Sequence, residues 1–434
     1  MKTEKTPRKY ALTGGLILNG HEDMEAVAGK AILISGDTIE DIINENETGD
    51  GYEKIDLNGR YVMPGLINMH VHLAGNGKPQ KKQRDNEKLV NLIFSVPFGA
   101  AAAHYLVSSY AGYELLSGVT TVRTVGGLRD LDTRVRDEIN SGSRVGPRIL
   151  AANEGITVPH GHMAGSVAIA ANNIDEAVQM VRSRAAQKVD LVKIMITGGV
   201  MDAKEKGVPG EMKMDPAMIK AVCDEAHKLG FKVAAHVESP QGVKAALENG
   251  VDSIEHGAKM DDDMIRLFKE TGAFLITTLS PALPYALFDR SVSNASEVEQ
   301  YNGKVVFDGI IECSKQALAN GIPVGLGNDV GCPWVSQYDF WRELVYFHKY
   351  VCVSNAFALY TATLGNARLA GIGNITGSID AGKKAELIVT ENNPLEDLNA
   401  LRSISMVIKD GNLIRDPEVK RKKIVDQELD KFTK

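Results

Sequence analysis

Between Gly65 and about Gly373, short apolar runs alternate with amphipathic stretches. The runs include RILAAN, LVKIMIT, KVAAHV, FLITT and IPVGLG, and the amphipathic stretches include DPAMIKAVCDEAHKLG and DDDMIRLFKETG. Continuous apolar strands between amphipathic helices are typical of a parallel sheet that is covered on both faces. Counting from the strand that ends at His70 gives about eight strand–helix units, which favours a closed barrel over an open sheet. We therefore expect an α/β fold with a (β/α)8 TIM-like barrel.

The two ends of the chain have a different pattern. The first sixty or so residues alternate short β-branched runs with Gly and Asn-Gly breaks, and this pattern returns in GSIDAGKKAELIVTENNP and SMVIKDGNLI. The simplest interpretation is that both ends pair into one small β-sandwich domain. The expected parts are the N-terminal half of the sandwich (1–63), the barrel (64–375), the C-terminal half of the sandwich (376–416) and a charged tail (417–434). We expect the tail to be a solvated helix or a frayed end.

Composition excludes some classes of protein. The 434 residues are 44% hydrophobic and 24% charged, which is ordinary for a globular protein with a large core. The formal net charge of -7 argues against nucleic acid as a partner, because binding phosphates needs a basic face. The four cysteines are scattered, which indicates free thiols in a reducing compartment.

One segment has the length of a membrane span, from Leu89 to Val107. Polar and helix-breaking residues interrupt it, and no charged flanks mark an orientation. We interpret it as a buried barrel helix or as a subunit contact, which would make the protein a homo-oligomer. The N-terminus has no apolar stretch long enough for a signal peptide. We expect a cytoplasmic protein without a membrane partner.

Histidines and one aspartate follow the predicted strands. His70 and His72 stand two apart at the end of an apolar run, and residues i and i+2 of a strand share a face. His236, His256 and Asp329 each follow a later strand. Because the carboxyl ends of all barrel strands open onto one mouth, these side chains are expected to converge there. Imidazole and carboxylate ligands suit Zn²⁺ or a similar ion.

Lys193, in DLVKIMITGG, lies within an apolar strand. A buried ammonium group is rarely tolerated without a partner, so a salt-bridged structural lysine is one interpretation. Beside the histidines, a functional one is favoured. A desolvated lysine loses its proton readily, and the neutral amine can react with CO2 to form a carbamate, an oxygen ligand able to bridge two cations.

Taken together, these motifs resemble the amidohydrolase superfamily, in particular its imidazolonepropionase-like and prolidase-like branch, which includes Xaa-Pro and Xaa-Arg/Lys dipeptidases. The matching segments run from about residue 10 to 415. They are PGLINMHVHL, LLSGVTTVRTVGG, LVKIMITGGV, KVAAHVES, GVDSIEHG, IPVGLGNDVG and NARLAGIGNITGSIDAGKKAELIVTENNPLEDL.

The resemblance implies a role for each residue. His70 and His72 would hold one divalent ion, His236 and His256 a second, and Zn²⁺ is the expected metal. Lys193, carboxylated by CO2, would bridge both ions. Two such ions generate hydroxide near neutral pH and polarise the scissile carbonyl. Asp329 would ligate the first ion and act as the proton shuttle, as general base and then general acid.

The motif PHGHM adds two candidates, His160 and His162, after the third predicted barrel strand. In prolidase-like relatives a histidine here contacts the substrate near the scissile carbonyl. We therefore assign substrate binding to both and a catalytic contact to His160, while a loop histidine satisfied by backbone groups remains the structural alternative. His104 and His227 lie in helical patterns and are expected to be structural. His21 and His348 carry no motif.

The chain also departs from the family pattern. Asn68 and Thr124 stand where relatives commonly have Asp, and Asn328 stands where they commonly have Thr. Such changes around the ligands can tune a site without abolishing it. Between Gly198 and Phe231 there is no tyrosine, which dipeptide-cleaving relatives often use to bind the substrate carboxylate. Lys204, Lys206 and Lys213 lie there instead.

The leading hypothesis is a binuclear metal-dependent hydrolase that cleaves an amide bond in a small molecule such as a dipeptide or an N-acyl amino acid. Hydrolysis of a cyclic amide such as an imidazolone, or deamination, is the alternative. Deaminase branches usually use one metal and lack the bridging lysine, so Lys193 favours the first hypothesis. A non-catalytic scaffold that keeps the fold without metals is the third.

Overall fold

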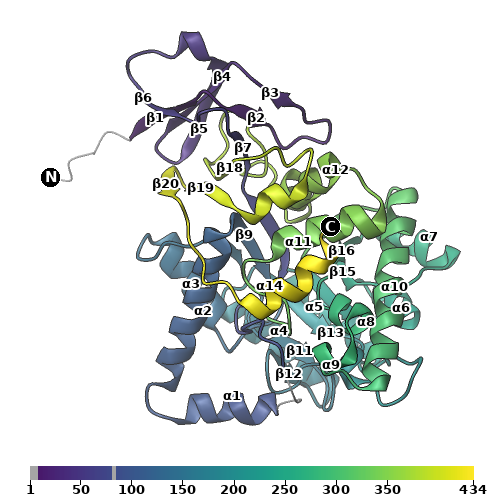
Figure 1. Ribbon diagram of the computed structural model, residues 1–434. Helices are drawn as coiled ribbons and strands as arrows, with labels where there is room; N and C mark the ends of the chain where they lie inside the picture. The colour runs from purple at the N-terminus through teal and green to yellow at the C-terminus, as the bar shows by residue number, and fades with distance from the viewer. Residues whose placement is uncertain (1–7, 81–84) are drawn as a thin grey trace.

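The computed structural model describes residues 8–80 and 85–434. The first seven residues, part of the N-terminus in which we expect no signal peptide, lie outside the described residues. The central region has ten strands in two parallel sheets (Figure 1). They are β8 (Leu66–Val71), β9 (Val119–Thr124), β10 (Arg148–Leu150), β11 (Gly155–Thr157), β12 (Ala168–Ala170), β13 (Leu191–Met195), β14 (Lys232–Val237), β15 (Ser253–His256), β16 (Phe274–Thr277) and β17 (Val324–Leu326).

The parallel strands form a three-stranded sheet in the order β10-β9-β8 and a seven-stranded sheet in the order β12-β11-β13-β14-β15-β16-β17. Backbone hydrogen bonds link the two sheets at both sides. The Asp329 amide donates to the His70 carbonyl at 2.9 Å, and the Asp190 amide donates to the Ala151 carbonyl at 2.7 Å. This arrangement fits the predicted TIM-like fold, although the strands are divided between two sheets instead of forming one closed sheet.

Helices surround the parallel strands (Figure 1). Their starts follow ordinary capping chemistry: side chains of Asn173, Ser239 and Asp261 accept hydrogen bonds from first-turn amides, and Pro216 and Pro240 open two helices. The helices are α1 (Asn86–Ser95), α2 (Gly99–Leu116), α3 (Leu131–Asn140), α4 (Ile174–Ala186), α5 (Pro216–Lys228), α6 (Pro240–Glu248), α7 (Asp262–Thr271), α8 (Leu283–Leu287), α9 (Arg290–Ser293), α10 (Glu297–Ala319), α11 (Phe340–Tyr346), α12 (Asn355–Tyr360), α13 (Asn366–Leu369) and α14 (Lys423–Leu429).

Strands from both chain ends meet in one six-stranded sheet, in the order β20-β19-β18-β7-β2-β3, next to a four-stranded sheet, β5-β4-β1-β6. A shared apolar core, including Tyr10, Ile32 and Leu387, lies between them. Strands from the two ends thus pair in one sheet, while their assignment to a single sandwich domain stays a prediction. The strands are β1 (Lys9–Thr13), β2 (Leu16–Leu18), β3 (Ala26–Val27), β4 (Lys30–Ser35), β5 (Thr38–Asn44), β6 (Glu53–Asp56), β7 (Tyr61–Pro64), β18 (Leu387–Thr390), β19 (Ile404–Lys409) and β20 (Asn412–Arg415).

The apolar segment 89–107 is not one buried barrel helix, so that interpretation is wrong. It is divided between α1 and α2, which are bent by 118° at the break. No residue of α1 is buried, and Leu92 and Phe98 are 60% and 87% exposed. Within the described residues no single helix is long and apolar enough to cross a membrane, and only this bent pair passes on length and composition.

The charged tail is more ordered than the sequence suggests. Within it α14 buries Val425 and Leu429 against the barrel helices. Arg342 of α11, whose side chain is 1% exposed, pairs with Asp426 at 2.9 Å and with Asp430 at 2.7 Å. The tail contains a helix, as expected, but one side of this helix is packed against the protein, and its carboxylates neutralise a buried arginine.

Candidate active site

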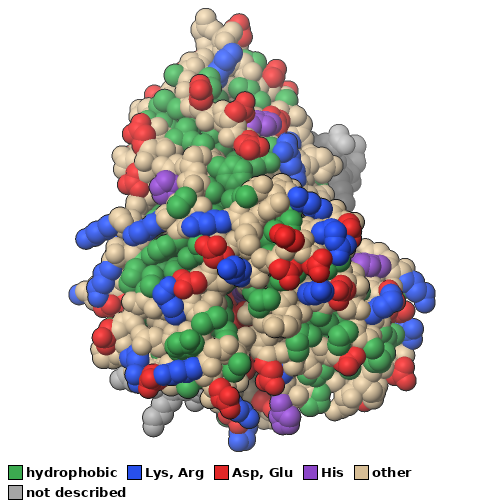
Figure 2. All heavy atoms as spheres, turned by 90° about the vertical axis from the view of Figure 1, so that its right-hand side faces the viewer, with side chains coloured by type: hydrophobic (Ala, Val, Ile, Leu, Met, Phe, Trp, Pro, Cys, Tyr) green, Lys and Arg blue, Asp and Glu red, His purple; other side chains and the backbone are tan. Residues whose placement is uncertain are grey.

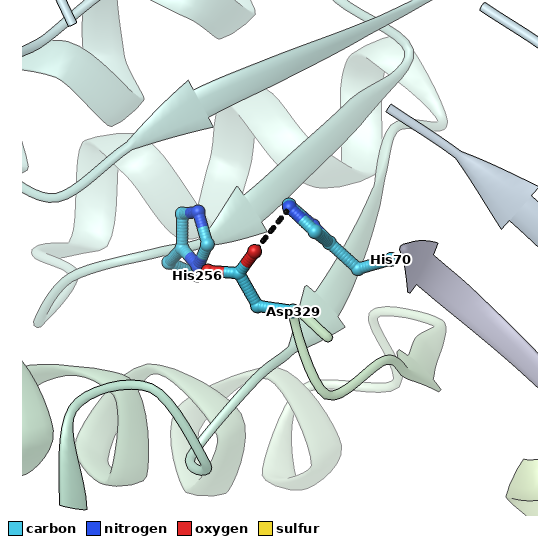
Figure 3. Close-up of side chains that lie close together, drawn as sticks. All are labelled: His70, His256 and Asp329. Atoms are coloured by element: carbon cyan, nitrogen blue, oxygen red, sulfur yellow. Dashed lines mark ion pairs between the residues drawn. The ribbon is translucent and has the colours of Figure 1, made fainter. Parts of the chain in front are cut away.

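Asp329 and the histidines converge at the carboxyl ends of the parallel strands. Nε2 of His70 and Nε2 of His72 lie 3.5 Å and 3.1 Å from Oδ1 of Asp329. One ligand atom each of His70, His256 and Asp329 lie within 4.8 Å of one another, so a single ion could touch all three (Figure 3). The predicted convergence of residues from β8, β15 and the loop after β17 is thus present in the structure.

Two of these residues have a left-handed backbone, with φ of +71° at His256 and +55° at Asp329. Non-glycine residues rarely adopt this conformation, and it tends to occur at functional sites. At the end of β15 it breaks the alternation of the strand. As a result Glu255 and His256, although adjacent in sequence, both lie beside His70.

The rings are oriented by partners on their Nδ1 atoms. Nδ1 of His70 lies 2.8 Å from Glu255, Nδ1 of His72 lies 2.8 Å from the Gly126 carbonyl, and Nδ1 of His256 lies 2.6 Å from Oγ1 of Thr278. When Nδ1 donates, Nε2 keeps its lone pair for a metal, which is the usual arrangement of metal-binding histidines.

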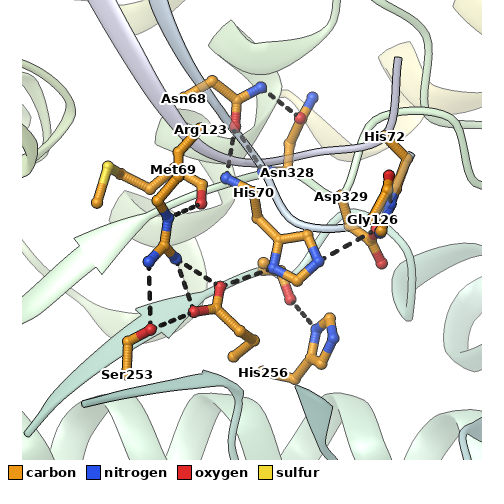
Figure 4. A network of polar contacts seen from close by, with 12 residues as sticks. Asn68, Met69, His70, His72, Arg123, Gly126, Ser253, His256, Asn328 and Asp329 are labelled. Atoms are coloured by element: carbon orange, nitrogen blue, oxygen red, sulfur yellow. Dashed lines mark hydrogen bonds and ion pairs between the residues drawn. The ribbon is translucent and has the colours of Figure 1, made fainter. Parts of the chain in front are cut away.

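Sequence reasoning missed the buried pair that holds His70. Arg123 of β9 donates to both carboxylate oxygens of Glu255 at 2.6 and 2.8 Å, and Ser253 donates to the same carboxylate at 2.7 Å (Figure 4). Glu255 is fully buried. The available signal was the presence of Arg in VTTVRT and Glu in SIEHG, two charges inside apolar strands.

Burial disfavours the charged form of His70, His236 and His256. It holds the pKa of His70 and His236 well below the ordinary value and lowers the pKa of His256 to about 3, with nearby positive groups, Lys193 among them, acting in the same direction on all three. Burial opposes ionisation of Asp329, but the neighbouring His70 and His72 hold the pKa of this carboxyl well below its ordinary value. Neutral imidazoles around an ionised carboxylate are the protonation states that a cation needs.

Lys193 lies on β13 among these groups and is 1% exposed. Its Nζ has no hydrogen-bond partner among the described residues. Burial lowers the pKa of this amine to about 8, while Glu255 acts in the opposite direction. No ion pair of Lys193 within residues 8–80 and 85–434 supports the structural alternative, a salt-bridged lysine, and the buried amine fits a group that is to be modified.

Glu238 is a second residue that sequence reasoning missed. It follows β14 two residues after His236, and single ligand atoms of His236, Glu238 and His256 lie within 4.8 Å of one another. Burial, together with the negative charges of Asp329 and Asp202, raises the pKa of Glu238 to about 8. The same i, i+2 spacing that relates His70 to His72 could have found it.

The structure separates the two histidines of PHGHM. The ring of His162 stacks on His236 with 4.0 Å between centroids, and its Nδ1 lies 2.6 Å from Asp202. His160 is exposed, with a left-handed φ of +61°, and no contact in the described part of the chain joins it to the other site residues. Of the two predicted substrate contacts, the structure therefore brings only His162 to the strand ends.

Two of the residues that depart from the family pattern, Asn68 and Asn328, are hydrogen-bonded to one another. Asn68 donates through Nδ2 to Oδ1 of Asn328 at 2.8 Å, and its own Oδ1 accepts from the Asn328 amide at 3.2 Å (Figure 4). These bonds tie β8 to the segment that carries Asp329. Thr124 accepts from the Ala152 amide at 3.3 Å. Asn68 and Asn328 thus form a neutral, hydrogen-bonded pair.

The remaining histidines have structural partners. His104 pairs with Glu138 and His227 with Asp252, at 2.8 and 2.7 Å, as expected of structural residues. His21 lies 3.0 Å from Asp380, and His348 lies 2.7 Å from the Val353 carbonyl. The four cysteines are free thiols, as predicted.

A pocket of about 500 Å³ lies beside the site. It is lined by Asp202, which binds His162, and by Tyr285, whose pKa is raised by burial, with Cys332 and Glu238 acting in the same direction. Lys204 and Trp334 also line the pocket. On the outer face in Figure 2, acidic and basic side chains are interspersed.

Residues 61–414 match the model of the amidohydrolase family. The chain belongs to this family. It is 23% identical to ochratoxinase of Aspergillus niger over 93% of this chain and 86% of that protein, and 23% identical to imidazolonepropionase of Thermoanaerobacter pseudethanolicus over 78% of each. A crystal structure from Bifidobacterium longum is 34% identical with a TM-score of 0.86, covering 98% and 99% of the two chains. A Xaa-Pro dipeptidase structure is 29% identical with a TM-score of 0.81, covering 94% and 100%.

These matches place the amidohydrolase in the imidazolonepropionase-like and prolidase-like branch, as the sequence motifs predict. It is an enzyme that hydrolyses C–N bonds, which disfavours the non-catalytic scaffold. Amidohydrolases generally use divalent metals. The residues present fit such ions, because imidazole nitrogens and a carboxylate lie close enough to share an ion, and the buried Lys193 amine has no hydrogen-bond partner among the described residues.

Proposed function

We propose that this amidohydrolase is a binuclear enzyme that cleaves the amide bond of a dipeptide or an N-acyl amino acid. The observation that carries the proposal is the meeting of two histidine pairs with Asp329, close to a buried lysine, Lys193, whose amine has no hydrogen-bond partner among the described residues. The lysine favours two ions over one. It thereby favours amide hydrolysis over deamination.

The ligand set would be divided between the two pairs. His70 and His72, with Asp329, would hold one Zn²⁺, and His236 with His256 the other, while a carbamate on Lys193 bridges them. Bound divalent ions supply an activated water and polarise the carbonyl oxygen. The two-ion proposal predicts close to two equivalents of metal per chain by elemental analysis. One equivalent that is unaffected by Lys193→Ala would refute it.

Asp329 is positioned to move the proton. Its carboxylate is ionised and lies beside the histidines, so it can accept the proton of the attacking water. It can then deliver this proton to the leaving nitrogen, which converts a poor amide leaving group into a neutral amine. His162, stacked on His236 and held by Asp202, lies where it would contact the substrate. His160 stays a predicted catalytic and substrate contact that would require movement of its exposed loop.

The related proteins support an acyclic amide as substrate. The Xaa-Pro dipeptidase is named for the cleavage of a dipeptide, whereas imidazolonepropionase, which is named for an imidazolone, supports the alternative of a cyclic amide. The pocket of about 500 Å³ beside the strand ends is large enough for a small molecule of this kind.

A hydrolysis screen of the purified, metal-loaded protein tests the proposal. It would cover dipeptides with varied C-terminal residues, N-acyl amino acids, aryl amides and cyclic amides, with release of amine as the readout. Turnover of an acyclic amide is expected. Turnover of cyclic amides alone would replace the proposal with the imidazolone-type alternative.

We also propose that the protein is a cytoplasmic homo-oligomer whose two parallel sheets close one barrel. The exposed side chains of Leu92, Phe98 and Tyr105 belong to the arm that α1 and α2 form. Exposed apolar side chains that are grouped in this way often mark a contact with another protein. Light scattering of the wild type and of Phe98→Ser should show a smaller species for the variant. An unchanged mass would exclude this arm as the contact.

A further inference from the structure

Glu238 has no role in the ligand set above, yet its carboxylate faces the site. It lies just beyond the end of β14, and one of its oxygens is within 4.8 Å of the ligand nitrogens of both His236 and His256. Its Oε2 is buried and has no hydrogen-bond partner among the described residues. A buried acceptor without a partner is costly, so a ligand that supplies a donor or a positive charge would be stabilised there.

The neighbouring acidic groups are already engaged. Asp202 is bound by His162 at 2.6 Å and by the Gly199 amide at 2.8 Å, and Glu211 is paired with Lys213. No ion pair in the described ranges joins Glu238 to a lysine or arginine of the protein. The buried oxygen of Glu238 is therefore left for a donor that enters the site.

Glu238 also connects the metal centre to the pocket. The pKa of Tyr285, which lines the pocket, is raised by burial, and Glu238 acts in the same direction. The backbone of Glu238 is closely packed, because a Cβ on Gly210 would lie 2.5 Å from it, whereas a Cβ on Gly199 would lie 3.5 Å from its Oε2. The carboxylate therefore lies near both the histidines and the pocket lining.

We propose that Glu238 binds the protonated α-amine next to the scissile carbonyl, so that the enzyme prefers aminoacyl amides, such as dipeptides, to N-acylated amino acids. This inference rests on the proposed amide hydrolysis. An α-ammonium nitrogen lies about 2.5 Å from the carbonyl carbon, since both are bonded to the same Cα. A carbonyl held beside His236 and His256 therefore brings its ammonium group within reach of Glu238, where a charged hydrogen bond can form.

The test compares pairs of substrates that differ only at this amine. Each dipeptide is matched with its 2-hydroxyacyl analogue, in which a hydroxyl of similar size replaces the ammonium group. The wild type is expected to favour the amine by about 100-fold or more in kcat/KM, because a site built for a charged donor rejects an analogue that lacks it. In Glu238→Gln the ratio should fall to within about tenfold, mainly through KM for the dipeptide, with little change for the analogue.

Metal content and a control variant separate this role from others. Glu238→Gln should keep the wild-type metal equivalents, and Glu211→Gln, an exposed carboxylate on the neighbouring loop, should keep the wild-type ratio. Loss of an ion from Glu238→Gln, with both substrates affected equally, would make Glu238 a metal ligand and overturn the proposal. Equal turnover of both substrates by the wild type would also overturn it while leaving amide hydrolysis intact. Failure to cleave any acyclic amide would instead refute the proposed function itself.

Discussion

The two histidine pairs of the candidate centre are supported in different ways. His70 is held by a fully buried carboxylate that is itself bound by Arg123 and Ser253. His236 has a long 3.4 Å contact with the Gly198 carbonyl and ring contacts with His162 and His256. The first pair is thus fixed by buried charged groups, whereas the second is linked to the pocket through His162 and Asp202. We call His70 and His72 the first half of the centre, and His236 and His256 the second half. A rigid half suits permanent metal binding, and an adaptable half suits contact with substrate.

Asp329 belongs to both halves, since it lies near His72 and also groups with His256. We therefore expect the largest effect from Asp329→Asn. The amide cannot carry the proton, so kcat should fall by about 10²–10⁴ while much of the metal remains bound. Steady-state kinetics with elemental analysis measures both. Asp202→Asn, which changes a carboxylate bound to His162, is the matched control and should affect kcat far less. Near-wild-type turnover by Asp329→Asn would contradict the shuttle.

The second prediction concerns the buried support of the first half. Glu255→Gln should weaken the ion held by His70 by about 10–100-fold, because partners on the far nitrogen of a ligating histidine contribute that much to affinity. The ion of the second half should change little. Thr278→Val, which removes the partner of His256, should show the reverse pattern. Competition with a chromophoric chelator resolves the two affinities, and equal weakening of both ions by either variant would show that the halves are not independent.

The same comparison shows what the sequence could predict. The ligands were predictable because each ends an apolar strand, and parallel strands deliver their ends to one mouth. The roles of Glu255 and Arg123 were not predictable, because their ion pair joins β9 to β15. These strands belong to different sheets, and such a contact cannot be inferred from a local sequence pattern. His256 lies beside His70 together with its neighbour Glu255 and has a left-handed backbone, a conformation that no sequence periodicity indicates.

Loops and surfaces were less predictable than strand ends. The spacing of His160 and His162 does not indicate which of them reaches the site. The stacking of His162 on His236 depends on the loop conformation, in which His162 is held by Asp202. The segment 89–107 is apolar enough for a buried helix, but its break at Pro97 directs α1 away from the core. The many charged residues of the tail 417–434 suggest a solvated segment. Its buried partner, Arg342, is distant in the sequence, so the pairing cannot be predicted from the tail alone.

Lys193 lowers the pKa of one histidine in each half, His70 and His236. The smallest expected effect concerns the reactivity of its amine. With its pKa lowered to about 8 by burial, roughly a tenth of the amine is neutral at pH 7 and half at pH 8. Only the neutral amine attacks CO2. The initial rate of ¹³C-carbamate formation in metal-free protein, at fixed dissolved CO2, should therefore rise about fivefold from pH 7 to 8 and level off above pH 9. An ordinary lysine, with its pKa of 10.5, would instead gain about tenfold per pH unit throughout this range. Lys193→Arg supplies the background from other amines, and a tenfold rise without levelling would show that burial does not activate this lysine as the bridge between the two halves.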